Sequence, residues 1–121
     1  MQVKKTDGTF LLNHATVISF DEVFANEATL LQTDLAVVLG KKPAFTKPQS
    51  NFISFKQISG LPDEAYRLQI SASGIHIEAT TTAGAFYAVQ SLKQLLPFDA
   101  WKVSRKEVQL TTADITDAPR F

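Results

Sequence analysis

A regular alternation of apolar and polar residues near the middle of this 121-residue chain constrains its fold more than any other feature. Two runs, Tyr66–Ser71 and Ile75–Ala79, place an apolar residue at every second position and polar residues between them. Successive side chains of a strand point to opposite faces, so both runs predict strands with one buried and one wet face. The chain must therefore build a sheet that is covered on one side only.

The turn between these two runs predicts how the strands pair. Directly opposed residues of a hairpin lie on the same face, so a register is acceptable when apolar residues meet apolar ones. A two-residue loop at residues 73–74 opposes Ile70 to Ile77 and keeps both faces consistent. A register shifted by one residue would oppose Ile70 to His76 and mix the two faces. We therefore expect the register that pairs Ile70 with Ile77.

A first segment, residues 21–39, repeats its apolar residues at the i, i+4, i+7 spacing of an amphipathic helix. The predicted inner face comprises Phe24, Ala28, Leu31, Leu35, Val38 and Leu39. Ser19 and Glu22 are spaced for a capping box, with Asp21 as an alternative cap. Gly40 is placed for the left-handed position after the helix, Lys41-Lys42 for its carbonyl end, and Pro43 forbids continuation. We expect a helix that ends at Leu39.

A second helix is predicted over residues 82–96. Thr81 or Thr82 can cap its first turn, and Pro97 ends it. Small residues in its first turns, Gly84 among them, allow a close approach to the sheet. The predicted inner face comprises Ala85, Ala88, Val89, Leu92, Leu95 and Leu96.

The other segments complete a single domain over residues 1–121. We expect a flexible lead-in at residues 1–8 and a loop at residues 40–50. Further strands are expected at Thr9–Leu12, Ala15–Phe20, Asn51–Ile58 and Glu107–Ile115, with Val103 in a further short one. The expected fold class is α+β, a two-layer arrangement in which two helices cover one face of a mostly antiparallel, mixed sheet of five to seven strands.

Composition excludes several classes of function. Twelve basic and twelve acidic residues give a formal net charge of zero, which provides no basic surface for nucleic acid. The absence of cysteine rules out disulfides, thiol nucleophiles and cysteine-based metal sites. No apolar run approaches the ~20 residues of a membrane span, and no signal peptide is visible.

Both predicted helices carry apolar residues away from their sheet-facing side. In the first, Val23, Leu30 and Val37 recur every seven residues and lie roughly 130° from the inner face, at the ~100° per residue of an α-helix. In the second, Tyr87 points opposite the inner face and Phe86 lies on its flank. A helix that covers a sheet needs one apolar stripe, so a second stripe predicts a partner on the outside, with scattered surface apolar residues as the alternative.

Candidates for chemistry are few. His14 and His76 lie on different elements without metal-ligand spacing, and a turn and an outward strand position explain them. Paired carboxylates, as glycosidases need, occur at Asp63-Glu64 and at Asp114 with Asp117, but at turns or strand ends where such residues commonly cap or are solvated. The sequence therefore indicates no catalytic, cofactor or metal site.

Four motifs in order resemble the N-terminal domain of the β-N-acetylhexosaminidases, the family 20 glycoside hydrolases. They are the strand E-A-Y-R-L-Q-I at 64–70, the strand G-I-H-I-E-A at 74–79, the helix G-A-F-Y-A-V-Q-S-L-K-Q-L at 84–95 and the junction I-T-D-A-P-R-F at 115–121. Ala88 stands where the family has glycine and Ser91 where it has threonine. The match covers residues 60–121.

The resemblance implies a non-catalytic domain that precedes a TIM barrel within one chain. In the family, the barrel cleaves terminal N-acetylglucosamine or N-acetylgalactosamine with retention, the substrate's acetamido oxygen acting as nucleophile beside an Asp-Glu pair. These residues and the sugar-gripping arginine have no counterparts here, since Arg120 matches the junction arginine. The implied partners are the chain's own barrel and an amino-sugar glycan, and the implied domain interface comprises Val23, Leu30, Val37, Phe86, Tyr87, Asp117, Arg120 and Phe121.

Two other interpretations stay open at this stage. Hydrolases that remove O-linked N-acetylglucosamine or glucuronic acid carry similar N-terminal domains. A free-standing carbohydrate- or protein-binding module would use Trp101, Tyr66 or Phe98 for stacking, although most aromatic residues occupy core positions. The compartment is not determined, but an extracytoplasmic parent enzyme is expected from the resemblance, and residues 117–121 are expected to lead into its barrel.

Overall fold

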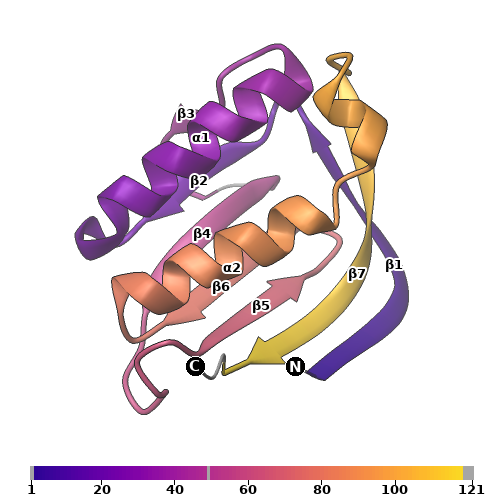
Figure 1. Cartoon of the computed structure of the whole chain (residues 1–121). Helices are drawn as coiled ribbons and strands as arrows, with labels where there is room; N and C mark the ends of the chain where they lie inside the picture. The colour runs from indigo at the N-terminus through magenta and orange to yellow at the C-terminus, as the bar shows by residue number, and fades with distance from the viewer. Residues whose placement is uncertain (1, 49, 119–121) are drawn as a thin grey trace.

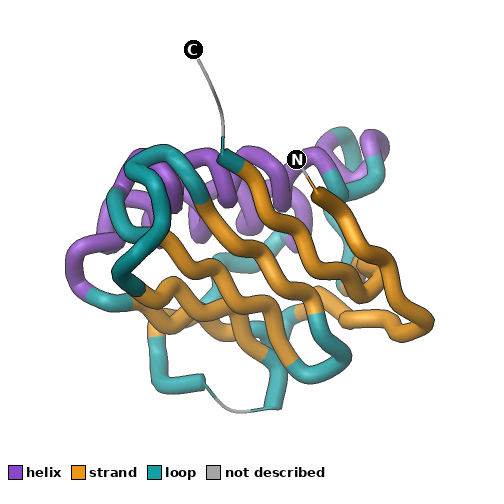
Figure 2. Tube along the Cα trace, turned by 90° about the horizontal axis from the view of Figure 1, so that it is seen from below, coloured by secondary structure: helices purple, strands orange, loops and turns teal. Residues whose placement is uncertain are grey.

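The computed structural model describes residues 2–48 and 50–118 and shows two helices lying side by side on one face of a seven-stranded sheet (Figures 1 and 2). The strands are β1 (Gln2–Asn13), β2 (Val17–Phe20), β3 (Ala44–Phe45), β4 (Phe52–Gln57), β5 (Tyr66–Ile70), β6 (Gly74–Ala79) and β7 (Glu107–Asp117). The helices are α1 (Ala25–Leu39) and α2 (Thr82–Gln94), with the 3-10 turns η1 (Glu22–Phe24) and η2 (Phe98–Trp101). The predicted α+β two-layer class is confirmed.

The sheet is mixed, with strand order β1-β7-β5-β6-β4-β2-β3. The pairs β1–β7, β7–β5 and β5–β6 are antiparallel, whereas β6–β4, β4–β2 and β2–β3 are parallel. The parallel half is larger than the sequence suggested, because α1 is a crossover between the parallel strands β2 and β4, and the chain returns from β4 through β5 to β6. The loop expected at residues 40–50 also contributes the short edge strand β3.

The N-terminal segment is not the flexible lead-in that the sequence predicted. Gln2 to Gly8 belong to β1, which pairs with β7 along its length, so the expected short strand at Thr9–Leu12 is the second half of one long strand. The register shifts between Lys5 and Thr9, where the Gly8 amide donates to Thr112 Oγ1 at 2.9 Å. The Asp7-Gly8 signal therefore marks an irregularity within a strand, because the partner strand supplies the hydrogen bonds that a loop would lack.

The β5–β6 hairpin has the predicted faces but a different register. Ile70 opposes Ile75 and Leu68 opposes Ile77, so the turn lies at residues 72–73 and the predicted pairing of Ile70 with Ile77 is wrong. A shift of two residues preserves which side chains share a face, so burial alone does not distinguish the two registers. The turn is closed by Ser71, whose hydroxyl donates to the Gly74 carbonyl at 2.9 Å.

Helix α1 ends as predicted and begins differently. Gly40 takes a left-handed conformation with φ of 69°. Neither the Ser19–Glu22 box nor Asp21 caps a helix through its side chain, since the Asp21 carboxylate instead accepts from the Gln57 amide at 2.7 Å. The inner face, comprising Phe24, Ala28, Leu31, Leu35, Val38 and Leu39, is buried as predicted.

The last carbonyl of α1 is bound by a residue far away in sequence. His14 Nε2 lies 2.7 Å from the Leu39 carbonyl oxygen, and the Lys41 ammonium donates to the His14 carbonyl at 3.2 Å rather than to the helix end. His14 thus satisfies an orphan carbonyl of the helix terminus.

Helix α2 is capped by Thr81, whose hydroxyl accepts from the Gly84 amide at 3.3 Å. It ends at Gln94 rather than at residue 96, and Leu95, predicted to face inward, is 40% exposed. The other predicted inner-face residues are buried. Val103 is 70% exposed and lies outside the strands, contrary to expectation, because β7 begins only at Glu107.

Candidate domain interface

The outer side of the two helices carries the second apolar stripe that the sequence predicted. Val23 is 45% exposed, Val37 53% and Phe86 41%, so three large apolar side chains of the helical layer face solvent. Leu30 and Tyr87 are half-buried and pack against the edge of the core. The structure therefore exposes Val23, Val37 and Phe86, whereas Leu30 and Tyr87, which the sequence placed on the same outer side, are partly covered by the domain's own core.

The aromatic part of this stripe is ordered by a ring contact. Phe86 and Tyr87 lie with centroids 5.9 Å apart at 70°, an edge-to-face geometry. The interaction of two rings in this geometry stabilises them beyond the burial of their apolar area, so each ring restricts the position of the other on α2.

A second apolar feature lies beside the end of α2 and was missed by sequence reasoning. A groove of about 190 Å³ runs between Leu95 and the β1–β7 pair, where it is lined by Val3, Ala113 and Ile115. Val3 is 46% exposed and Leu95 40%. The groove could not be found from sequence because it requires residues 2–5 to be a strand, and only the pairing with β7 makes them one.

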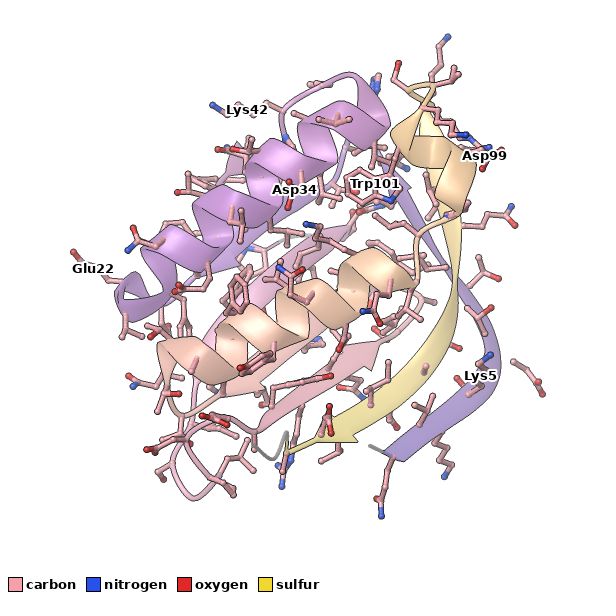
Figure 3. All side chains as sticks on the ribbon, viewed as in Figure 1. Lys5, Glu22, Asp34, Lys42, Asp99 and Trp101 are labelled. Atoms are coloured by element: carbon pink, nitrogen blue, oxygen red, sulfur yellow. The ribbon has the colours of Figure 1, made fainter. Side chains whose placement is uncertain are left out.

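A polar contact joins the two helices. Lys93 Nζ of α2 lies 3.0 Å from Asp34 Oδ2 of α1, and the same ammonium lies 5.7 Å from the centre of the Trp101 ring. Figure 3 shows Asp34 and Trp101 together at the gap between the helices, near the end of α2. Trp101 packs against the core, so this ring is not a free stacking platform for a sugar.

The C-terminal end of β7 lies beside a buried tyrosine that is bound to α2. Tyr66 is fully buried, its hydroxyl shares a hydrogen bond with Ser91 Oγ, and Asp117 stands opposite Tyr66 in the sheet register. Burial raises the pKa of Tyr66, the Ser91 hydrogen bond opposes that shift, and the neighbouring Asp117 carboxylate adds to it. Asp117 is the last residue of β7, whereas the other two predicted junction residues, Arg120 and Phe121, lie outside the described residues.

The remaining candidates for chemistry are separated by the fold. His14 lies at the end of α1, whereas His76 faces outward from β6, 3.5 Å from Ser54 Oγ. Asp63 lies in the turn before β5, and its carbonyl accepts a hydrogen bond from the Thr81 hydroxyl. Asp114 is exposed on β7.

Among the described residues there is no group of three potential metal ligands, and no helix there is long and apolar enough to cross a membrane. Tyr66 is buried and unavailable for stacking, and the side chain of Phe98 is outside the described set.

Comparison with known proteins gives one consistent result. The family model described as "Glycosyl hydrolase family 20, domain 2" matches residues 1–118. No curated protein sequence matches the chain at a significant level.

Solved structures of the same family are similar to the whole of this chain. An exo β-N-acetylglucosaminidase from Vibrio harveyi, solved with N-acetylglucosamine, matches 99% of the chain with a TM-score of 0.83 at 25% identity. A β-N-acetylhexosaminidase from Streptomyces coelicolor matches 99% at 0.78 and 28%, and one from Bacteroides fragilis 98% at 0.79 and 25%. The chain covers only 18%, 25% and 23% of those proteins, respectively.

Proposed function

Because the chain belongs to glycosyl hydrolase family 20, as domain 2 of that family, we propose that it serves as a scaffold for the catalytic domain of a longer β-N-acetylhexosaminidase. The domain is an accessory one, and catalysis lies in another domain. Its role is to cover and stabilise that domain, which in the family is a TIM barrel in the same chain. This proposal replaces the O-linked N-acetylglucosamine hydrolase and α-glucuronidase interpretations, since the family model that matches is family 20.

The proposed parent enzyme removes terminal N-acetylglucosamine or N-acetylgalactosamine with retention. The resemblance implies that the substrate's acetamido oxygen attacks the anomeric carbon while a glutamic acid protonates the leaving oxygen. Those groups belong to the barrel. This chain therefore contributes to catalysis only indirectly. It stabilises the barrel, and the end of β7 at Asp117 sets where the connection to the barrel begins.

The observation that carries the proposal is the exposed apolar stripe on the outer side of the helices. Val37 and Phe86 are about half exposed although they lie on helices whose other side is fully packed. Exposed apolar side chains on the outer side of a helical layer are expected where another protein surface covers it. The groove at Val3 and Leu95 adds exposed apolar side chains beside the end of α2.

The test compares this chain with the product of the reading frame extended beyond residue 121. The 121-residue chain should not turn over a nitrophenyl N-acetylglucosaminide, whereas the longer product should. Val37→Ser should lower the melting temperature of the longer product more than that of the chain alone, because the side chain is buried only against the barrel. Val103→Ser, a matched change at an exposed loop position, should alter neither.

Two results would contradict the proposal. Activity of the 121-residue chain above a heat-killed control would place catalysis within it. An equal effect of Val37→Ser on both proteins would show that the outer helix surface is not the domain contact.

A further inference from the structure

The solvent face of the sheet, opposite the helices, carries two hollows that share residues. The first, of about 270 Å³, lies over β5, β6 and β7 and is lined by Arg67, Gln69, Glu78, Asp114 and Thr116. The second, of about 380 Å³, extends to the irregular part of β1 and is lined by Thr6, Asp7, Gln69, Ser71 and Asp114. Because Gln69 and Asp114 belong to both, the hollows form one trough, which we call the sheet-face trough.

The sheet register places the polar groups of the trough in two rows. Arg67 stands directly between Glu78 and Thr116. Gln69 stands between His76 and Asp114 in the next row. The side chains are held on rigid neighbouring strands about 4.8 Å apart, so their spacing is set by the backbone rather than by flexible loops.

The charged members of the trough do not neutralise one another. Within residues 2–48 and 50–118, no ion pair or hydrogen bond joins the Arg67 guanidinium to Glu78 or Asp114, although Glu78 is its direct neighbour across the strands. Five guanidinium N–H donors and the carboxylate oxygens therefore remain open toward the hollow. Paired charges would instead leave a site with little capacity to bind.

The mixture of groups selects the chemistry of the ligand. Carboxylates at Glu78, Asp114 and Asp7 would repel phosphates, whereas the lining pairs these charged and amide groups with apolar surface, as an amphipathic ligand requires. Hydroxyl groups both donate and accept, so a polyhydroxylated ligand satisfies a guanidinium, an amide and carboxylates together. A glycan lying across the strands would meet a new set of side chains at each strand.

An aromatic ring lies on the same face, beside the trough. Phe52 is half-buried on β4, and its ring meets the His76 ring edge-on with centroids 5.2 Å apart. The ring lies over Gly74, where a Cβ atom would come within 2.5 Å of Phe52 Cζ, so a larger residue at position 74 would displace the ring. Phe52 therefore gives the trough an apolar border at its His76 end. Sequence reasoning missed this ring because the strand at 51–58 was not assigned to faces.

We propose that the sheet-face trough binds a glycan chain, with Arg67, Gln69 and Asp114 as its hydrogen-bonding centre and Phe52 at one end. The Gln69 amide donates and accepts at once, which complements an acetamido group. The choice of an N-acetylated sugar rests on the proposed function of the parent enzyme. The trough would hold a substrate polymer on the side of the domain remote from the helices.

The test is titration of the isotopically labelled 121-residue chain with the β-1,4-linked tetramer of N-acetylglucosamine, followed by amide chemical shifts. Saturable shifts are expected at Arg67, Gln69 and Asp114. Arg67→Ala should weaken binding about tenfold, the effect of losing one charge-assisted hydrogen bond. Arg105→Ala, the same substitution at an arginine of the loop before β7, should leave binding unchanged.

Several outcomes would overturn the proposal: no saturable shift, shifts confined to α1 and α2, or equal weakening by Arg67→Ala and Arg105→Ala. Binding of the matching glucose tetramer with equal affinity would refute the assignment of the acetamido group to Gln69. The titration uses this chain alone, so its failure leaves the scaffold proposal standing. An inactive extended product would likewise leave a positive titration standing.

Discussion

Replacing Gly84 with alanine tests how closely α2 is packed on the sheet. A Cβ atom at position 84 would lie well under 3.0 Å from the Ala65 carbonyl oxygen, which is closer than real Cβ atoms come to other atoms. It would also lie 3.1 Å from Ala79 Cβ. Neither obstacle can rotate away, because one is backbone and the other is the first atom of a buried side chain. The first turn of α2 would have to move off the sheet.

Two opposing effects set the magnitude. Alanine favours a helix over glycine by up to ~1 kcal/mol, which would stabilise the variant if space were available. Overpacking of a close-packed site costs typically ~1–3 kcal/mol, and here the shift would also loosen Ala85 and Ala88, which are fully buried. We expect the cost to exceed the gain, and the free energy of unfolding of Gly84→Ala to fall by ~1–2 kcal/mol.

Urea denaturation followed by Trp101 fluorescence measures the change. The matched control is Ala83→Gly at the neighbouring exposed position, where only helix propensity should act and cost up to ~1 kcal/mol. A Gly84→Ala variant that is more stable than the parent chain would refute the close approach of α2, because the propensity gain would then be unopposed.

Two further substitutions probe the core. Leu92→Asp should abolish cooperative unfolding, because Leu92 is 1% exposed and an unpaired buried carboxylate costs several kcal/mol of a typical total of ~5–15 kcal/mol; an unchanged melt would contradict this. Because burial raises the pKa of Tyr66, its neutral phenol contributes stability that is complete below the unfolded pKa of about 10 and is lost as pH rises through the folded value. Tyr66→Phe should therefore flatten the decline in urea midpoint between about pH 9 and 12 relative to Tyr87→Phe, and equal slopes would refute it.

The local features of the fold were predictable from the sequence because they depend on near neighbours. Period-two and helical periodicity located β5, β6, α1 and α2, since side-chain direction follows directly from backbone repeat. Gly40 and Thr81 took the terminal roles expected of their residue types. The outer helix stripe at Val37 and Phe86 was found for the same reason, because it follows from the helical phase alone.

Other features required the tertiary structure, since they depend on which segments meet. The sequence of residues 2–8 is polar and contains Asp7-Gly8, so only pairing with β7 makes it a strand and creates the groove at Val3. The observed hairpin register differs by two residues from the predicted one. Both registers bury the same side chains, so the choice between them depends on the turn that Ser71 closes.

The candidate site on the sheet divides in the same way. Alternation placed Arg67 and Gln69 on the wet face, and nothing in the sequence placed Asp114 beside them. Asp114 belongs to β7, lies more than forty residues after Gln69 in the sequence, and meets it only through the pairing of β5 with β7. Backbone repeat determines the direction of a side chain, whereas its neighbours are determined by long-range hydrogen bonding between strands, which no local pattern encodes.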